Sequence, residues 1–176
     1  MTISIQTKRL HLRNIQPSDV PSLIELWQNP DVTRYMGGPR EHDMLVKAFQ
    51  DELSAEQFEP FDLWPVVERE TGRVVGHCGL LEKTVDGQAD IELTYLFHQT
   101  AWGKGYATEI GRALCSYAVE QHGLSRLIAL IKPNNHASAR VAEKIGFTLA
   151  QETMRDDGSV RLVYAIRPVL LPDKVI

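Results

Sequence analysis

The sequence has few cysteines, no long apolar run and little excess of charge. Its two cysteines, Cys78 and Cys115, are isolated and lack the spacing of metal-binding or redox-active pairs. It contains no run of about 18 apolar residues, the length of a membrane span, so we expect no membrane partner. The net charge of −4 argues against a protein that holds nucleic acid by its phosphates. The expected setting is the reducing cytoplasm.

The order of the predicted elements indicates one α/β domain over residues 1–176. Apolar residues make up 43% of the chain and charged residues 24%, which are ordinary proportions for a globular domain. The opening residues, MTISIQTKRLHLRN, alternate between polar and apolar, which predicts a strand rather than a signal peptide. Strands and helices intermingle, so we expect a mixed, mainly antiparallel sheet flanked by helices. Strands are predicted at residues 3–13, 62–69, 73–83, 88–98 and 125–132, helices at 18–28, 41–58, 104–122 and 136–145, helix stops at Gly123 and Gly146, and a last hairpin over 156–159.

The stretch WGKGYATE, at residues 102–109, opens the third helix with two glycines that flank Lys104. A P-loop separates its glycines by four residues, and a dinucleotide fingerprint needs a third glycine where this chain has a threonine. Neither motif is present. The backbone amides of residues 103–108, at a helix N-terminus beside a lysine, could instead hold a pyrophosphate. The alternative is a glycine-rich turn between strand and helix that binds no ligand.

Four stretches in order along the chain resemble the GNAT superfamily of acetyl-CoA-dependent N-acetyltransferases. They are TKRLHLRNIQPSD, WQNPDVTRYM, YLFHQTAWGKGYATE and PNNHASARVAEKIGF. The closest likeness is to the RimJ/RimL branch, whose members acetylate the N-termini of ribosomal proteins. The resemblance spans nearly the whole chain. It implies a single N-acetyltransferase domain, in which a mixed central sheet contains a splayed strand pair, with acetyl-CoA as cosubstrate.

The resemblance also implies which residues bind the cofactor. The family's pyrophosphate loop falls on residues 102–107, and Trp102 replaces its usual basic or amide residue, which is a trait of this branch. That replacement leaves Lys104 and the backbone amides as the main phosphate partners. The preceding strand binds the pantetheine arm through its backbone, and Asn135 matches an asparagine beside that arm. The implied set is Leu96, Phe97, His98, Trp102, Gly103, Lys104, Gly105, Tyr106, Ala107, Thr108, Asn135 and Ser138.

One position departs from the commoner family pattern. Many members carry a tyrosine seven residues after the asparagine, as the acid that protonates the leaving thiolate, and this chain has Ala142 there. Ser138, three residues after Asn135, is what the RimL-like branch offers instead, so we expect it to stabilise the thiolate. The alternative is that Ser138 caps the N-terminus of the last helix.

Attack of an amine on a thioester needs a neutral amine, a stabilised oxyanion and a reprotonated thiolate, but no metal and no covalent nucleophile. In DIELTYLF, alternation places Leu93 and Tyr95 on one face of the strand and Glu92 on the other. Glu92 is therefore the candidate general base, acting directly or through one water. The alternative is a solvated position on the sheet face. A backbone N–H near Phe97 is the candidate donor to the oxyanion.

Other residues are weaker candidates. We expect His98 to pack or to contact the cofactor rather than act as a base, and His77 to be a satisfied core or sheet-face histidine. The surroundings of Cys78 and Cys115 are apolar, which predicts inert thiols. Four aromatic residues are expected in the core more than in a substrate pocket, although one or two could line the acceptor site: Trp27, Tyr35, Phe61 and Trp64.

The acceptor is left open among three alternatives: a protein or peptide N-terminus, a small amine such as a polyamine, amino acid or aminoglycoside, or no acceptor at all in a non-catalytic acetyl-CoA-binding module. Lys47 is the single base in a segment with seven acids, a pattern that would attract a cationic amine or simply solvate a helix face. The chain is expected to be a monomer or a homodimer, because the apolar tail PVLLPDKVI could cover the core or contact a second subunit. The acids are Glu41, Asp43, Asp51, Glu52, Glu56, Glu59 and Asp62.

Overall fold

The computed structural model describes residues 3–55, 59–155 and 157–167. The last residues of the helix predicted at 41–58 and the tail at 168–176 lie outside this range, as does residue 156 of the predicted last turn. No helix within the described ranges is both long and apolar enough to cross a membrane.

Eight strands form one sheet in the order β1-β2-β3-β4-β5-β6-β8-β7. Only β5 and β6 run parallel among the described strands, and every other pair is antiparallel. The predicted mixed, mainly antiparallel sheet is confirmed. The strands are β1 Ser4–Gln6, β2 Leu10–Arg13, β3 Leu63–Glu68, β4 Val74–Val85, β5 Gln88–Phe97, β6 Leu127–Ile131, β7 Thr148–Met154 and β8 Val160–Ile166. The helices are α1 Val20–Gln28, α2 Pro30–Thr33, α3 His42–Ser54, α4 Tyr106–His122 and α5 His136–Ile145, with short 3-10 turns η1 Pro17–Asp19 and η2 Gln99–Ala101.

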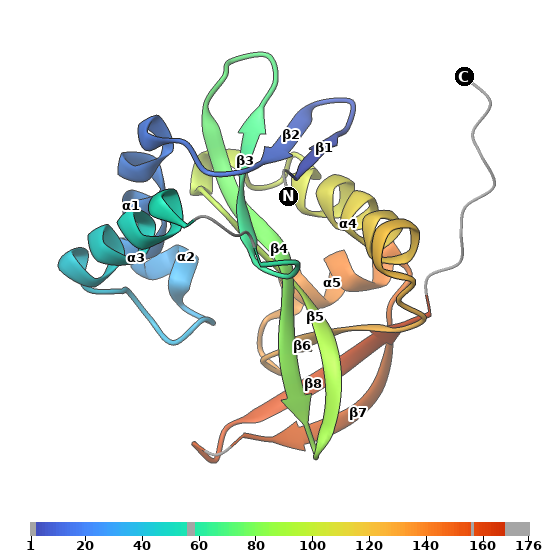
Figure 1. Ribbon diagram of the computed structural model, residues 1–176. Helices are drawn as coiled ribbons and strands as arrows, with labels where there is room; N and C mark the ends of the chain where they lie inside the picture. Colours follow the sequence, from blue (N-terminus) through green and yellow to red (C-terminus); the bar gives the residue numbers. More distant parts are fainter. Residues whose placement is uncertain (1–2, 56–58, 156, 168–176) are drawn as a thin grey trace.

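Helices cover both faces of the sheet. In Figure 1, α1–α3 lie on one side and α4 and α5 on the other. The main core lies under α4, where Ile110 and Leu114 pack with Leu93 of β5. A smaller cluster joins Leu23 of α1 to Phe49 of α3. In Figure 1 the lower ends of β4, β5, β7 and β8 extend beyond the helices, so one end of the sheet is free of helical cover.

The strand predicted at residues 3–13 is wrong in one respect, because the chain turns back within it. β1 and β2 pair with each other, and the turn at residues 7–9 between them is closed by the bond from Thr7 N to Leu10 O (2.9 Å). The polar–apolar alternation runs through this turn without a break, so the pattern alone could not reveal it. Helix α2 was not predicted either, since its four residues are too few to show a 3.6-residue period.

The predicted helix stops are confirmed, and a tight turn joins β4 to β5. Asp86 and Gly87 both have positive φ, as a two-residue turn between β4 and β5 requires. Gly123 ends α4 and Gly146 ends α5, each with its N–H bonded to the last turn of its helix.

Strands β5 and β6 separate soon after they meet. The parallel ladder between them contains one registered pair, Glu92 with Ile128. Beyond it, β5 continues toward Phe97 and β6 toward the loop before α5. The predicted splayed pair is thus present, and it leaves backbone groups of both strands without a sheet partner.

Candidate active site

The loop between β5 and α4 presents bare backbone at a helix N-terminus. Gly103 and Gly105 have φ of +74° and +79°, which favour glycine, and no side chain caps the first turn of α4. A Cβ added at Gly103 would meet nothing within 4 Å, so the space beside the loop is open. Uncapped amides at the start of a 17-residue helix suit a phosphate group.

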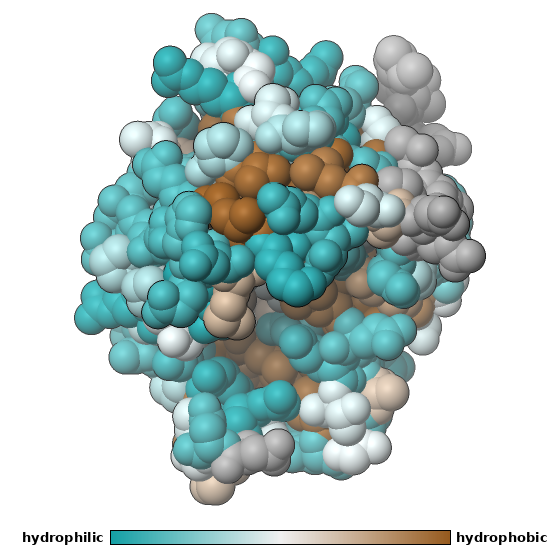
Figure 2. Space-filling model, turned by 60° about the vertical axis from the view of Figure 1, so that its left-hand side comes forward, coloured by the Kyte–Doolittle hydropathy of each residue, from teal (hydrophilic) through white to brown (hydrophobic). Residues whose placement is uncertain are grey.

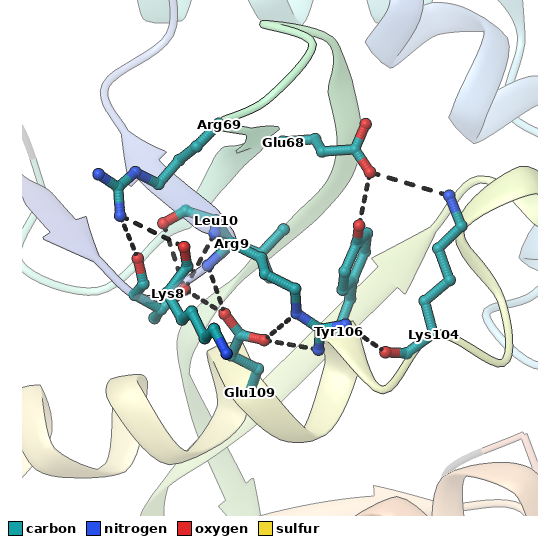
Figure 3. A network of polar contacts seen from close by, with 9 residues as sticks. Lys8, Arg9, Leu10, Glu68, Arg69, Lys104, Tyr106 and Glu109 are labelled. Carbon is teal, nitrogen blue, oxygen red and sulfur yellow. Dashed lines mark hydrogen bonds and ion pairs between the residues drawn. The ribbon is translucent and has the colours of Figure 1, made fainter.

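Lys104, the predicted phosphate partner, lies beside Glu68 of β3. Its Nζ is 3.8 Å from Glu68 Oε1, which also accepts a 2.5 Å hydrogen bond from the Tyr106 hydroxyl (Figure 3). The Tyr106 hydroxyl, followed by that of Thr71, lowers the pKa of Glu68. Lys104 is half exposed, so its ammonium can move from Glu68 to a ligand.

The β1–β2 turn is docked on the same helix start through an ion pair that the sequence did not reveal. Arg9 Nε and Nη2 lie 2.7 and 2.6 Å from Glu109 Oε2, and Arg9 Nη1 donates to the carbonyl oxygen of Lys104 at 2.8 Å. Glu109 Oε1 accepts from the Thr7 hydroxyl and from Arg9 N. Burial opposes ionisation of Glu109, but these bonds outweigh it and lower its pKa.

Trp102 ties the loop back to β5. Its indole Nε1 donates to Phe97 O at 2.8 Å, while half of the residue stays exposed. In this position Trp102 holds the loop against the end of the strand. Trp102, which the resemblance puts in place of a basic or amide residue, therefore has a structural use here.

Of the three strand-end residues predicted to bind pantetheine, Phe97 alone turns its backbone toward the splay. His98 N donates to Val75 O of β4 at 2.9 Å, and successive N–H groups point to alternate edges of a strand. The N–H of Phe97 therefore points to the β6 side, where the ladder has ended. Leu96 O faces β4, where the Cys78 thiol approaches it at 3.8 Å. The His98 ring contacts Ser22 Oγ of α1 at 3.1 Å.

Glu92 spans the splay. Leu93 packs with α4, so Glu92 points to the opposite face of the sheet. Its Oε1 accepts from Leu130 N of β6 at 3.3 Å, and its Oε2 lies 3.9 Å from Lys83 Nζ. The side chain is only 14% exposed, which contradicts the alternative of a solvated position. Burial raises the pKa of Glu92, against the opposing effects of Lys83 and the Leu130 amide.

Ser138 is not the cap of α5, so the alternative considered for it is wrong. The cap is Asn135, whose Oδ1 accepts from Ser138 N at 3.2 Å. Asn135 Nδ2 also lies 3.1 Å from Ser138 Oγ, so the serine hydroxyl accepts there and keeps its own proton for another partner. Ala142, one turn further along α5, is buried.

Tyr95 is a residue of the site that the sequence reasoning placed only on a strand face. Its hydroxyl donates to Ser138 O at 3.1 Å and so joins β5 to the start of α5. Burial raises the pKa of Tyr95 to about 12, which keeps the phenol protonated near neutral pH. Its place on the same face as Leu93 was visible in the strand alternation, but its reach to α5 was not.

The remaining candidates lie in the core, with one exception. His77 is buried as predicted, but it is only half satisfied: Nδ1 accepts from Trp27 Nε1 at 3.0 Å, and Nε2 has no partner among the described residues. Burial lowers its pKa to about 4. Both thiols are buried, and burial raises the pKa of each, that of Cys115 to about 12, in agreement with the expectation of inert thiols. Tyr35 is the exception, since its hydroxyl donates to Asn134 O at 3.3 Å, in the loop before α5.

The other aromatic residues agree with the expectation of a core role. Trp64 is buried, and Phe61 and Trp27 are partly buried against the two core clusters. Within the described ranges, no three side chains of histidine, cysteine, aspartate or glutamate are grouped so that they could hold a metal ion.

Together these features form an arrangement that suits a carrier that bears phosphate. Amides at a helix start face open space, two strands part beside them, and a buried carboxylate lies across the gap. The sequence profile of the acetyltransferase (GNAT) domain matches residues 9–148, and the chain belongs to this family of acetyl-CoA-dependent enzymes.

A curated relative and solved acetyltransferase structures match most of the chain. The protein YkkB of Bacillus subtilis is 33% identical over 141 residues, which cover 80% of this chain and 82% of YkkB. An acetyltransferase from Agrobacterium tumefaciens has 30% identity and a TM-score of 0.78, over 94% of this chain and 95% of that one. RimL, a ribosomal L7/L12 alpha-N-protein acetyltransferase solved with coenzyme A, shares the fold at 18% identity with a TM-score of 0.75, over 94% and 98%.

Proposed function

We propose that this protein transfers the acetyl group of acetyl-CoA to a primary amine, the α-amine of a protein or peptide N-terminus, by direct attack in a ternary complex. The observation that carries the proposal is Glu92, a buried carboxylate with a raised pKa beside the strand splay. The fold shared with RimL, whose name gives a protein N-terminus as its substrate, supports the choice of acceptor.

Glu92 is the base in this mechanism. An amine must lose a proton to attack, and a carboxylate whose pKa lies nearer neutrality than usual is a better acceptor for that proton. The amide of Leu130 fixes one carboxylate oxygen at 3.3 Å. The other oxygen takes the proton from the amine, directly or through one water.

The chain's other groups hold and polarise the donor. Acetyl-CoA supplies an activated thioester carbonyl. The amides of residues 103–108, with Lys104, hold the pyrophosphate at the start of α4. The N–H of Phe97, which points into the splay, donates to the carbonyl oxygen as negative charge develops there. The Ser138 hydroxyl, oriented by Asn135 at 3.1 Å, donates to the departing sulfur, which then takes its proton from water.

A small cationic amine is the second candidate acceptor, and one observation favours it. Glu52 at the end of α3 and Asp62 just before β3 are half-buried near each other, and burial followed by the charge of Asp62 raises the pKa of Glu52 to about 7. The backbone of Asp62 is packed against Gly79 of β4, since a Cβ added at Gly79 would come within 1.9 Å of Asp62 O. Gly79 pairs with Thr94, two residues from Glu92 on the same face of β5.

The face on which an acceptor would approach is the one that α1–α3 border. Figure 2 views the molecule from that side and shows a largely hydrophilic surface, with apolar side chains gathered in its upper half and in a hollow below its middle. The other described members of the acidic segment, including Glu41, Asp43 and Asp51, are exposed, and Glu56 lies outside the described residues.

Release of free coenzyme A across a matched panel tests the proposal. The panel contains peptides with a free N-terminus, the same peptides with an acetylated N-terminus and an internal lysine, and polyamines. Turnover of the free peptides but not of the blocked ones supports the proposed α-amine acceptor. Turnover of polyamines alone favours the second candidate. Binding of coenzyme A without release from acetyl-CoA over the whole panel would identify a non-catalytic module.

A further inference from the structure

The contact between Arg9 and the loop before α4 holds the backbone of that loop as well as the β1–β2 turn. Figure 3 shows the Arg9 side chain between the Glu109 carboxylate and the carbonyl oxygen of Lys104. Arg9 Nη1 donates to that oxygen at 2.8 Å. The contact joins residues 95 positions apart, and it lies on the backbone of the proposed phosphate cradle.

The carbonyl that Arg9 holds belongs to the same peptide unit as the amide of Gly105. In a trans peptide the C=O and N–H bonds point in opposite directions, and no cis peptide occurs among the described residues. Holding Lys104 O toward Arg9 therefore turns the N–H of Gly105 away from the β1–β2 turn. With its φ of +79°, Gly105 has no side chain to fix this orientation by packing.

Arg9 is itself held on several sides. Two of its guanidinium nitrogens contact Glu109 Oε2 at 2.6 and 2.7 Å, its own N–H reaches Glu109 Oε1 at 2.9 Å, and its guanidinium carbon lies 4.6 Å from the centre of the Tyr106 ring. Glu109 belongs to the first turn of α4, and its side chain is 18% exposed. The arginine therefore cannot leave Lys104 O without breaking charge-assisted bonds, which are the stronger kind.

We propose that Arg9 is a positioning residue for acetyl-CoA: it holds the Lys104–Gly105 peptide so that the Gly105 amide faces the pyrophosphate, and Glu109 holds Arg9 in place. This inference rests on the cradle described under the proposed function. It concerns a contact within the protein, and it assigns Arg9 no bond to the ligand.

Three variants test the device: Arg9→Gln, Arg9→Lys and Glu109→Gln. The matched control is Arg112→Gln, since Arg112 also lies on α4 and also donates to a backbone carbonyl, that of Lys144 at 2.6 Å. Binding of coenzyme A is measured by calorimetry. Rates are measured with acetyl-CoA and with S-acetylpantetheine, which carries the thioester but no pyrophosphate. Thermal melts without ligand record the stability of each variant.

We expect Arg9→Gln to weaken coenzyme A binding and to raise KM for acetyl-CoA about 10-fold, the equivalent of one hydrogen bond from a charged group. The kcat with acetyl-CoA and the kcat/KM with S-acetylpantetheine should not change. Glu109→Gln should weaken binding in the same direction, and Arg9→Lys should fall between wild type and Arg9→Gln. If Arg9→Gln does not fold, the other two variants carry the test.

Three results would overturn the proposal. Equal losses with both acetyl donors would show a general structural role. Tighter binding of coenzyme A by Glu109→Gln would show that Arg9 acts only as a positive charge near the phosphates, since that variant unmasks its charge. If Arg9→Gln binds coenzyme A as tightly as Arg112→Gln does, Arg9 has no role in positioning the cofactor. The cradle itself fails separately, if wild type uses S-acetylpantetheine as well as it uses acetyl-CoA.

Discussion

Replacing Glu92 with glutamine removes the proposed base while keeping the shape of the side chain. The amide oxygen of glutamine can still accept the hydrogen bond from Leu130 N, which is 3.3 Å from the carboxylate. The contact with Lys83 is lost, but at 3.9 Å it is at the limit of an ion pair, and the Lys83 side chain is one-third exposed and can turn to solvent. The fold should survive, so a change in rate reports on the chemistry.

The size and pH dependence of the effect follow from the same contacts. Loss of a general base lowers turnover by roughly 10²–10⁴-fold. Burial raises the pKa of Glu92, so the acid limb of the wild-type rate profile should lie above the ordinary glutamate value of 4.5 and be missing in the variant. Affinity for coenzyme A should hardly change, because Glu92 does not belong to the phosphate cradle.

Glu92→Gln should lower activity without lowering the stability of the fold. An acid whose folded pKa is raised stabilises the fold below its ordinary pKa, and this contribution is lost as pH rises through the folded value. Glutamine avoids that loss. We expect the variant to be at least as stable as wild type at pH 8 and the difference to vanish below pH 4.5, as measured by urea unfolding. A near-normal rate across the pH range would remove Glu92 from the mechanism.

Three further predictions address the cradle, the leaving group and the acidic pair. Acetyl-CoA at 100 times its Kd should stabilise the fold by about 2.7 kcal/mol, seen as a rise in melting temperature. Gly105→Val should abolish this rise, because a branched side chain at φ +79° blocks the backbone amides. A full rise in the variant would contradict the cradle. Ser138→Ala should lower turnover with little change in melting temperature, whereas Asn135→Ala should lower the free energy of unfolding by about 1 kcal/mol, because the helix cap is lost. Normal turnover in Ser138→Ala would contradict the proposed role of Ser138. Burial and Asp62 raise the pKa of Glu52 to about 7, so the wild type should lose unfolding free energy relative to Glu52→Gln as pH rises from 5 to 8, and parallel stability curves would refute this.

The sequence predicted those parts of the fold whose signal is local. Helix α4 combines a long apolar stripe with a glycine stop, and the β4–β5 hairpin has Asp86-Gly87 at its turn, so both were predicted nearly to their ends. The break between β1 and β2 was missed because its cause is distant. The turn is held by Thr7 and Arg9 on Glu109, about 100 positions along the chain, and no local pattern records that contact.

The candidate site divides in the same way. The glycines of the cradle were visible because they are neighbours in sequence. The choice of cap was not, since Asn135 and Ser138 are both residue types that cap helices, and only the structure shows Asn135 accepting from Ser138 N. Tyr95 was placed on the correct strand face, but its bond to Ser138 O depends on how α5 packs against β5.

The separation of β5 and β6 underlies these features, because strands that stayed paired would leave no backbone groups free for a ligand. Strands β5 and β6 pair at Glu92 and Ile128 and then part, which exposes the N–H of Phe97 and would also orphan the amide of Leu130. The Glu92 carboxylate accepts a hydrogen bond from this amide. The residue that satisfies the broken ladder is therefore also a carboxylate beside the gap, and its burial there raises its pKa. A structural need and the proposed catalytic role coincide in Glu92, so the glutamine variant, which can meet only the structural need, separates them.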